Sequence, residues 1–282
     1  MNRGRLLKKQ ATIFSVELED GKILECVARK NLKKDGLFVG DFVFVDEYNS
    51  ICKLDKRKNI LIRPPVANID KMFIVVAPIP KPDLYTVDKM LLFCAVNDIV
   101  PVVCINKKDL DEQYCKKIES VYKKIAKTVI ISTKDSSFEK LKKLIDGVCV
   151  LAGQSAVGKS SIINALKGSE VAKVDTFSKK VERGKQTTRT VELYQFGQNR
   201  YLADTAGFSK LDESLLNLEV NEVKSYYPEF LEFAQNCKYK SCLHTNDRDC
   251  AVCKALKNGK ISQERYQNYK KLIEVLQSLK KF

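Results

Sequence analysis

The stretch that decides the fold is Gly153-Gln154-Ser155-Ala156-Val157-Gly158-Lys159-Ser160, which matches the phosphate-binding loop pattern Gly-x4-Gly-Lys-Ser in full. It follows the apolar run 148–151 and precedes a segment of helical character that begins near Ser161. In such loops glycines let the backbone curl, so that its N–H groups and the helix N-terminus face phosphates. We therefore expect a strand, loop and helix in which Lys159 reaches the terminal phosphates of a nucleotide and the Ser160 hydroxyl binds Mg²⁺.

A second motif, Asn106-Lys107-Lys108-Asp109, follows the apolar run 101–105 and has the form of the guanine-recognition motif of GTPases. Guanine presents two donors side by side, its N1–H and its exocyclic amine, and the two oxygens of Asp109 can accept both. Adenine offers a donor and an acceptor at these positions, which would leave one oxygen unpaired. We expect Lys107 to lie along the base and Asn106 to hold the loop together. Beside a phosphate loop, this motif predicts specificity for GTP.

A third element, Ser132-Thr133-Lys134, ends the apolar run 129–131. It can give backbone N–H groups to guanine O6, although Ser-Thr clusters also commonly do no more than end strands. With it, the candidate GTP-binding residues are Asn106, Lys107, Asp109, Ser132, Thr133, Gly153, Gln154, Ser155, Ala156, Val157, Gly158, Lys159, Ser160, Ser161, Asp204 and Gly207.

Two short motifs further along complete a site for magnesium and the γ-phosphate. Asp204-Thr205-Ala206-Gly207 has the Asp-x-x-Gly form, in which the carboxylate holds Mg²⁺ and the Gly207 N–H faces the γ-phosphate. Gln186-Thr187-Thr188-Arg189 supplies a threonine that closes over Mg²⁺, for which we choose Thr188. The predicted magnesium ligands are Ser160, Thr188 and Asp204.

These motifs leave the residue that orients the hydrolytic water open. Phe208 stands where many GTPases carry a glutamine, and an apolar ring cannot orient water. We therefore expect slow intrinsic hydrolysis. Gln186, beside the switch threonines, is the available substitute, and an ordinary role in the switch is an equal alternative for it. The candidate catalytic residues are Lys159, Thr188 and Gln186.

The order of these motifs differs from that of conventional GTPases. There the phosphate loop, the switch threonine and Asp-x-x-Gly precede the guanine motif and the Ser-Ala-Lys element, whereas here the last two come first, at 106 and 132. The domain is therefore predicted to be circularly permuted, which is tolerable because domain ends often lie close together at the surface. As a consequence, Asp-x-x-Gly leads directly into residues 208–282.

The rest of the chain predicts a multidomain protein. The runs 13–18, 23–28, 42–45 and 60–62, with a hairpin signal at Asp20-Gly21, indicate an N-terminal β-barrel of the OB-fold type, residues 1–66. Residues 67–211 alternate apolar strands, including 72–77, with helices such as 87–96, as a P-loop GTPase domain does. Residues 212–282 look mostly helical and zinc-binding; in their last helix Tyr266, Tyr269, Leu272, Ile273, Leu276 and Leu279 share one face after a cap at Ser262.

The charge and the distribution of apolar residues restrict the kinds of partner that we expect. The chain carries 50 Lys plus Arg against 35 Asp plus Glu, a net charge of +15, which favours a polyanion and nucleic acid above all. A lysine-rich solvated exterior is the alternative explanation. The basic clusters 33–34 and 56–58 fall between the predicted barrel strands and suit RNA binding. The sequence contains no apolar run of the roughly 20 residues that a membrane helix needs and no secretory signal, so we expect a cytoplasmic chain without a membrane partner.

The ten cysteines fall into two groups. Six are scattered in apolar surroundings, as buried thiols often are. Cys237, Cys242, Cys250 and Cys253 crowd around His244, the single histidine, which indicates a reduced compartment and a closed zinc site rather than disulfides. Five candidates compete for four places. We expect one structural Zn²⁺, because a small helical segment needs help to form a core.

Together these residues resemble one family, the ribosome small subunit-dependent GTPase A family. The resemblance lies in the motif order, in 89–110 and in 237–269, where Cys250-Ala251-Val252 and Gly259-Lys260-Ile261-Ser262 recur in the family's manner. It implies an OB barrel, a permuted GTPase domain and a zinc domain, with Cys237, Cys242, His244 and Cys250 as ligands and Cys253 as an extra thiol. Gln186 departs from the family, which usually has a histidine there.

The resemblance implies a GTPase that acts late in maturation of the small (30S) ribosomal subunit, is stimulated by the subunit, binds its rRNA and leaves on hydrolysis. The expected ligands and partners are GTP and GDP, Mg²⁺, one Zn²⁺ and the small subunit, and we expect a monomer. The alternative is a GTP-gated RNA-binding switch without catalysis, because of Gln186 and Phe208. A phosphotransferase is disfavoured, since the guanine motif has no purpose in a kinase and the sequence shows no base to accept a proton from an acceptor.

Overall fold

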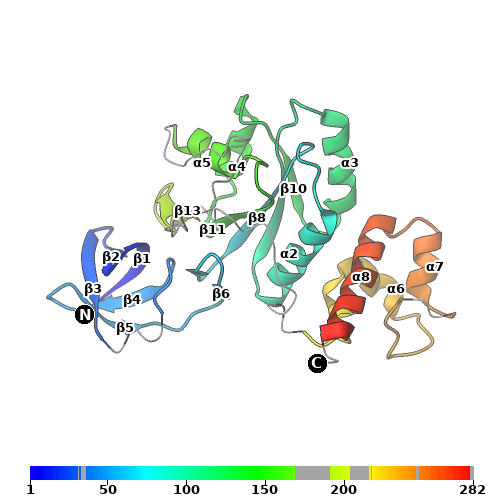
Figure 1. The fold of residues 1–282 in the computed structure, drawn as a ribbon, viewed down its shortest axis with the longest axis horizontal. Helices are drawn as coiled ribbons and strands as arrows, with labels where there is room; N and C mark the ends of the chain where they lie inside the picture. Colours follow the sequence, from blue (N-terminus) through cyan, green and yellow to red (C-terminus); the bar gives the residue numbers. More distant parts are fainter. Residues whose placement is uncertain are drawn as a thin grey trace, which may run out of the picture.

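The computed structural model has a β-barrel, a central α/β part and a helical C-terminal part (Figure 1). It describes residues 1–30, 32, 36–168, 191–203, 216, 218–245 and 248–279. The central part lies between the other two (Figure 1). Within the described ranges, none of the helices combines the length and the apolar character required to span a membrane.

Five strands form the closed barrel in the order β1-β2-β3-β5-β4. They are β1 (Asn2–Gln10), β2 (Ile13–Leu18), β3 (Ile23–Ala28), β4 (Phe42–Val45) and β5 (Ser50–Leu54). β1 closes the barrel by antiparallel pairing with both β2 and β4, and β3 pairs with β5 in parallel. This is a five-stranded barrel of the OB type, as predicted.

The approach of β1 to β2 depends on a glycine. A Cβ at Gly4 would lie 2.6 Å from Val16 Cγ1 and 2.7 Å from the Glu17 carbonyl oxygen, closer than real contacts allow. The predicted hairpin at Asp20-Gly21 is confirmed, with the Lys22 N–H donating to Asp20 Oδ1 at 2.9 Å.

One predicted barrel strand was wrong. The run 60–62 does not join the barrel; β6 (Ile60–Leu61) pairs with β7 (Val66–Ala67) in a separate two-stranded sheet. The remaining barrel positions are filled by β1 and β5, whose charged and cysteine-containing sequences carry no alternating apolar pattern. In β1 the alternation is broken by a bulge between Leu6 and Lys8.

The central sheet has six strands in the order β10-β9-β8-β11-β13-β12. They are β8 (Lys71–Val76), β9 (Val100–Ile105), β10 (Lys127–Ile130), β11 (Gly147–Ala152), β12 (Leu193–Gln195) and β13 (Arg200–Ala203). All neighbours are parallel except β12 and β13. The predicted α/β domain is therefore confirmed.

Helices cover both faces of this sheet, and β8 shows the division. Met72 and Ile74 pack in one cluster with α2 (Leu84–Val96) and α3 (Glu112–Tyr122). Phe73 and Val75, which point the other way, pack in a second cluster with α4 (Glu139–Lys142) and α5 (Lys159–Lys167). α2 begins three residues before the predicted start at 87, because Asp83 caps it by accepting the Tyr85 N–H at 3.2 Å.

The C-terminal part consists of η3 (Val223–Tyr226), α6 (Pro228–Ala234), α7 (Ala251–Lys257) and α8 (Gln263–Leu279). The predicted cap is confirmed, since the Ser262 hydroxyl accepts the Arg265 N–H at 3.4 Å. Of the predicted apolar face, five residues are buried, but Leu279 is 51% exposed, because it ends the described helix beyond the last core contact.

Candidate functional site

The loops that follow β11, β9 and β10 carry the three nucleotide motifs. Because these strands are parallel, their carboxyl ends meet at one edge of the sheet, the usual place for a ligand in such folds. The phosphate loop connects β11 to α5 at this edge (Figure 1). Motifs whose first residues lie 21 to 47 positions apart in sequence are thereby brought together.

Two glycines of the phosphate loop are required by close approaches. Gly153 has φ +138°, and a Cβ there would lie 2.2 Å from the carbonyl oxygen of Val75 in β8. Gly158 has φ +99°, and a Cβ there would lie 2.4 Å from Asn106 Nδ2. The loop therefore packs directly on β8 and on the guanine motif only because both side chains are absent.

The ammonium of Lys159 lies inside the curve of the loop. Its Nζ donates to the carbonyl oxygens of Gly153 and Gln154, both at 2.7 Å. The side chain of Val157 is buried in the core and anchors the loop from below. Ser160 and Ser161 follow in the first turn of α5.

Asn106 and Lys107 tie the guanine motif to the phosphate loop. Asn106 is buried and donates from Nδ2 to the carbonyl oxygen of Val157 at 2.9 Å. Lys107 Nζ donates to the carbonyl oxygens of Ala156, at 2.7 Å, and Ile79, at 2.8 Å. Desolvation by burial lowers the pKa of Lys107, while the charge of Asp109 opposes that shift.

Asp109 is held as a carboxylate by the Ser132-Thr133-Lys134 element. It accepts from Lys134 Nζ at 2.7 Å and from Ser132 Oγ at 2.6 Å. Hydrogen bonds from Lys134 and then Ser132 lower the pKa of Asp109. Ser132 is itself buried, and its N–H donates to Ser137 Oγ at 2.8 Å. The carboxylate therefore keeps its charge and acts only as a hydrogen-bond acceptor.

A second cluster lies in the helical part. The ligand atoms of Cys237, Cys242, His244 and Cys250 all lie within 4.8 Å of one another. His244 Nδ1 is 3.6 Å from Cys237 Sγ and 3.4 Å from Cys250 Sγ, and the two sulfurs are 3.9 Å apart. Ligands around a tetrahedral zinc with Zn–S bonds of about 2.3 Å are separated by roughly 3.8 Å. The four residues thus form a Cys3His cluster that fits a structural zinc ion.

The last helix fixes the chain around this cluster. Tyr266 OH donates to the carbonyl oxygens of His244, at 2.8 Å, and Thr245, at 3.0 Å. Tyr269 OH donates to the carbonyl oxygen of Leu243 at 2.6 Å. Cys253 stays outside the cluster: its Sγ lies 3.4 Å from Tyr266 Oη. The metal cluster and α8 therefore form one unit.

Comparisons with known proteins agree with this geometry. A sequence model described as RsgA GTPase matches residues 54–214. A protein of Caldanaerobacter subterraneus subsp. tengcongensis named small ribosomal subunit biogenesis GTPase RsgA is 38% identical, covering 99% of this chain and 97% of its own. A protein of the same name from Bacillus cereus is 35% identical, and the match covers 99% of each. This chain belongs to the RsgA GTPase family.

Solved structures extend the RsgA likeness to the whole fold. YjeQ from Thermotoga maritima superposes with a TM-score of 0.79 at 30% identity, covering 98% of each chain. YloQ, described as a circularly permuted GTPase, gives 0.79 at 28% identity and covers 99% of this chain and 96% of its own. The permutation is visible in this chain too, because β11 leads into the phosphate loop yet follows β8, β9 and β10 in sequence. As a member of this family the chain is a GTP-hydrolysing enzyme.

Some of the predicted site residues are placed by the structure, and others lie outside the described residues. Gln186, Thr188, Asp204, Gly207 and Phe208 lie outside the described residues. Of the predicted magnesium ligands only Ser160 is therefore placed, half-buried, while Ser155 is exposed in the loop and Thr133 is half-buried beside Ser132.

Three contacts of the site were not predicted from the sequence. They are the ion pair of Lys134 with Asp109, the hydrogen bond of Ser137 to Ser132, and the carbonyl oxygen of Ile79 as a partner of Lys107. Lys134 directly follows Ser132 and Thr133, which were predicted to bind the nucleotide, so its positive charge could have predicted the ion pair with Asp109. The other two depend on loop conformation, for which the sequence gives no signal.

Proposed function

We propose that this RsgA-family chain hydrolyses GTP to GDP and phosphate late in maturation of the small ribosomal subunit, that the subunit stimulates hydrolysis, and that hydrolysis releases the protein. The observation that carries the proposal is the convergence of Lys159, Asn106 and Asp109 at one edge of the sheet. Likeness over nearly the whole chain to proteins named small ribosomal subunit biogenesis GTPases supports the ribosomal part.

The base and the phosphates are assigned to different loops. Asp109 accepts the two donors of guanine, Lys107 lies along the base, and Ser132 and Thr133 supply N–H groups to O6. Residues 153–158 surround the phosphates with backbone N–H groups. The Lys159 ammonium, which now donates to two carbonyl oxygens of the loop, turns to the β- and γ-phosphates.

Magnesium and the hydrolytic step are assigned to Ser160, Thr188 and Asp204 together with Gln186. Ser160 stands in the first turn of α5, directly after Lys159, and we assign its hydroxyl to Mg²⁺ beside the phosphates. Mg²⁺ neutralises charge that develops on the phosphates. Thr188, Gln186 and Lys159 are the candidate catalytic residues, and Gly207 completes the γ-phosphate site.

A zinc ion held by Cys237, Cys242, His244 and Cys250 stabilises the C-terminal domain. Bound zinc supplies folding energy and no reaction step. The extra thiol of Cys253, which lies beside Tyr266, stays out of the coordination. We divide the chain into residues 1–66, 67–211 and 212–282.

The protein binds the small subunit through contacts with its rRNA. A net charge of +15 favours phosphate contacts that release counterions. Of the predicted basic clusters, 33–34 lies outside the described residues, and Lys56 and Lys58 are exposed. Exposed basic side chains on the barrel and the zinc-binding part are Lys9, Lys22, Arg29, Lys30, Lys53, Lys56, Lys58, Arg63, Lys238, Lys240, Arg248, Lys254, Lys257, Lys260 and Lys271. We expect a monomer that acts in the cytoplasm.

Single-turnover hydrolysis of GTP, measured with and without purified small subunits, tests the proposal. We expect slow turnover alone and an increase of at least tenfold with subunits. Equal rates in both conditions would refute stimulation. The matched control is Lys159→Met, which removes the ammonium at the phosphates and should abolish turnover in both conditions. A chain that binds GTP and the subunit but never cleaves GTP is instead a GTP-gated RNA-binding switch.

A further inference from the structure

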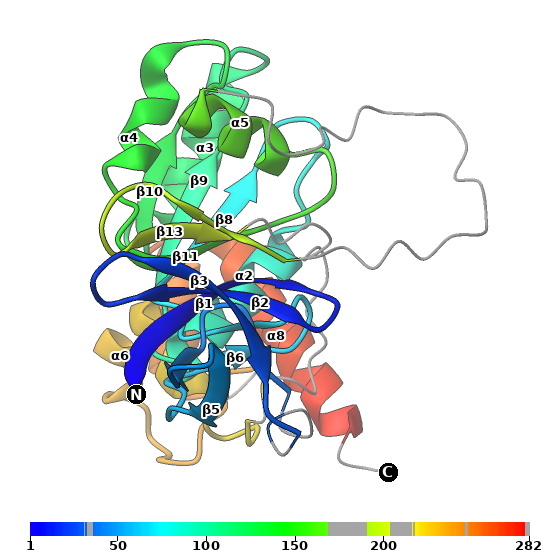
Figure 2. The same cartoon turned by 90° about the vertical axis from the view of Figure 1, so that its left-hand side faces the viewer.

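The hairpin of β12 and β13 forms the edge of the central sheet that faces the barrel, and in Figure 2 β13 lies directly above the barrel strands. Leu193 pairs with Ala203, so both ends of the hairpin lie together. Ala203 lies beside Val150 of β11, just before the phosphate loop. The chain continues from Ala203 into Asp204, and the candidate switch threonine precedes β12 in sequence. A shift of the hairpin therefore moves the attachment points of both switch motifs.

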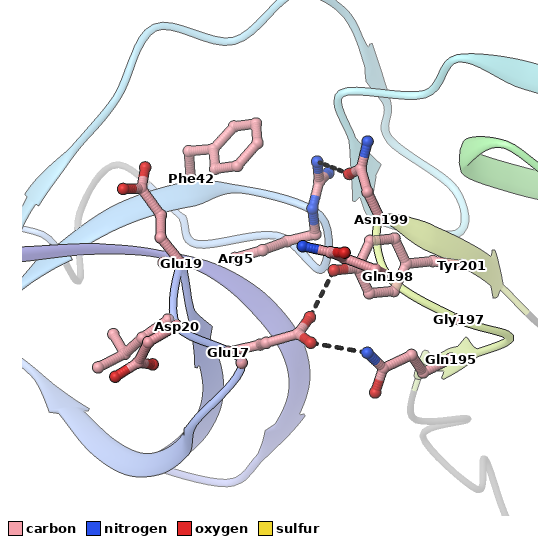
Figure 3. Close-up of a pocket in the computed structure, with 13 residues that line it drawn as sticks. Arg5, Glu17, Glu19, Asp20, Phe42, Gln195, Gly197, Gln198, Asn199 and Tyr201 are labelled. Carbon is pink, nitrogen blue, oxygen red and sulfur yellow. Dashed lines mark hydrogen bonds between the residues drawn. The ribbon is translucent and has the colours of Figure 1, made fainter.

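The barrel contacts this hairpin through Glu17 of β2. Its carboxylate accepts hydrogen bonds from Tyr201 OH of β13 and from Gln195 Nε2 of β12, the latter at 2.7 Å (Figure 3). One barrel side chain thus holds both strands of the hairpin. Burial and the hydrogen bond to Glu17 raise the pKa of Tyr201 to about 12, so the hydroxyl keeps its proton and remains the donor.

Two basic residues of β1 extend the contact. Lys8 Nζ lies 3.1 Å from Glu192 Oε2, and the two residues also form an antiparallel bridge. The Arg5 guanidinium lies 4.2 Å from the Phe42 ring centre and 5.1 Å from that of Tyr201, and its Nη2 donates to Asn199 at 3.4 Å. The barrel therefore touches the hairpin from its open end to its turn.

The polar groups of this contact orient the barrel and the hairpin relative to each other more than they stabilise the protein. Glu17 and Arg5 are each 8% exposed, and Arg5 Nη1 is buried with no hydrogen-bond partner among the described residues. Desolvation of such groups opposes the gain from pairing them, and apolar packing would serve stability better. A cavity of about 460 Å³ also opens beside the contact, lined by Glu19 and Gln198 among others. A few directed hydrogen bonds therefore set how the barrel and the hairpin, which is itself paired to β11, sit against each other.

We propose that Glu17 is a positioning residue for GTP hydrolysis: from the barrel it fixes the β12–β13 hairpin, and so links the state of the barrel to the nucleotide site. The inference rests on the proposed GTPase activity and not on the identity of the barrel's partner. Glu17 acts through Tyr201 and Gln195 and does not touch the nucleotide. Hydrolysis should therefore depend on this contact, while binding of GTP should not.

Single-turnover hydrolysis by the full chain provides the first test. Glu17→Ala should lower the rate at saturating GTP roughly tenfold, the scale of a small misplacement of reacting groups, and leave the Kd of GTP within about twofold. Glu17→Gln, whose amide can accept from Tyr201 and still bond Gln195, should recover most of the rate. The matched control is Glu19→Gln, because Glu19 lines the same cavity, is 72% exposed and pairs with Arg3 of the barrel rather than with the hairpin. An unchanged rate in Glu17→Ala overturns the proposal, as does equal loss of rate and GTP affinity.

Hydrogen exchange of the backbone amides gives a second test that needs no hydrolysis. Replacing GDP by a non-hydrolysable GTP analogue should change exchange in residues 4–8 and 15–18 of the barrel as well as in 191–203. In Glu17→Ala the change in the barrel should disappear, whereas the change in residues 191–203 should remain. If GTP binds but the barrel never responds in the wild-type chain, the inference is wrong while the proposed function stands. If no nucleotide binds in a direct titration, the proposed function fails and this inference with it.

Discussion

Arg265 of α8 and Asp88 of α2 form a buried ion pair, with Nη1 2.6 Å from Oδ1, that joins the zinc-binding part to the GTPase domain. Arg265 Nε also contacts Glu229 of α6 at 2.5 Å, and Asn268 donates to the second oxygen of Asp88 at 2.7 Å. Burial opposes the charge of Arg265, but the two carboxylates raise its pKa above the ordinary value. The two parts are thus connected by packed helices as well as by the chain that leads from the Asp-x-x-Gly motif.

Replacing this arginine should destabilise the protein strongly. Arg265→Met leaves Asp88 and Glu229 as buried carboxylates without their partner, which typically costs about 3–5 kcal/mol. Because the chain has no tryptophan, urea unfolding followed by far-UV circular dichroism is the suitable measurement. Lys270→Met also removes a positive charge from this helix, and Lys270 has no buried ion pair within the part of the chain that the structure describes, so this variant should alter stability by less than about 0.5 kcal/mol. Similar losses of unfolding free energy in both variants would refute the role of the ion pairs of Arg265 with Asp88 and Glu229.

The ion pair of Asp88 with Arg265 could not be predicted from the sequence. Asp88 and Arg265 are 177 residues apart, and neither lies in a motif, so only the fold brings them together. Strands β8, β9, β10 and β11 of the central sheet were predictable because buried parallel strands are largely continuous apolar runs, and the motifs at the ends of β9, β10 and β11 fixed the site. The short antiparallel strand β12 carries no such run and was not predicted. β1 was missed because Arg3 and Arg5 look like surface charge, whereas both guanidiniums lie over the Phe42 ring at 3.9 and 4.2 Å. Residues 60–62 were predicted to join the barrel only because they are apolar. The sheet that such a short strand joins depends on its pairing partner, which the sequence does not show.

The metal cluster predicts which thiols retain zinc. Cys242→Ser removes one of four ligands and should lower the zinc content of the purified protein well below one per chain, with loss of helical signal from α7 and α8. Cys253→Ser should keep one zinc per chain, because this thiol borders the cluster beside Tyr266 but is not one of the four grouped ligand atoms. Metal analysis together with circular dichroism measures both effects. Loss of zinc in Cys253→Ser would show that Cys253 replaces one of the assigned ligands.

Nucleotide binding should survive removal of zinc. The phosphate loop and the guanine motif are held by contacts within the central sheet, such as that of Asn106 with Val157, and none of these contacts involves the cluster. Titration of a fluorescent GDP analogue into chelator-treated protein should therefore give a Kd within about threefold of the untreated value. A much larger loss would mean that α8 supports α2 and, through it, the nucleotide site.

The acid sensitivity of the barrel should depend on Asp46. Hydrogen bonds from the Ser50 N–H, the Cys52 thiol and Arg29 lower the pKa of Asp46 from 3.8 to about 2. Since the unfolded chain binds this proton first, the stability that Asp46 contributes is present above about pH 4 and is lost as the pH falls toward 2. Asp46→Asn should therefore be less stable than wild type at pH 6 and show a flatter decline between pH 4 and 2. Urea midpoints measured across that range test this, and Glu47→Gln, an exposed neighbour, should follow the wild-type curve.

The contacts of Asp109 predict a switch of nucleotide specificity. An asparagine at this position offers one acceptor and one donor, so Asp109→Asn should bind GTP about 100-fold more weakly, because the guanine amine then meets a second donor. Xanthine replaces that amine with a carbonyl oxygen and should pair with the new amide, so xanthosine triphosphate should bind better than GTP. Competition against a fluorescent GDP analogue measures both affinities. Glu112→Gln, three residues on and paired with Lys116 on the exposed face of α3, should leave both unchanged. Unaltered GTP affinity in Asp109→Asn would contradict the assignment of this carboxylate to the base, since its remaining partners, Ser132 and Lys134, can bond an amide oxygen as well.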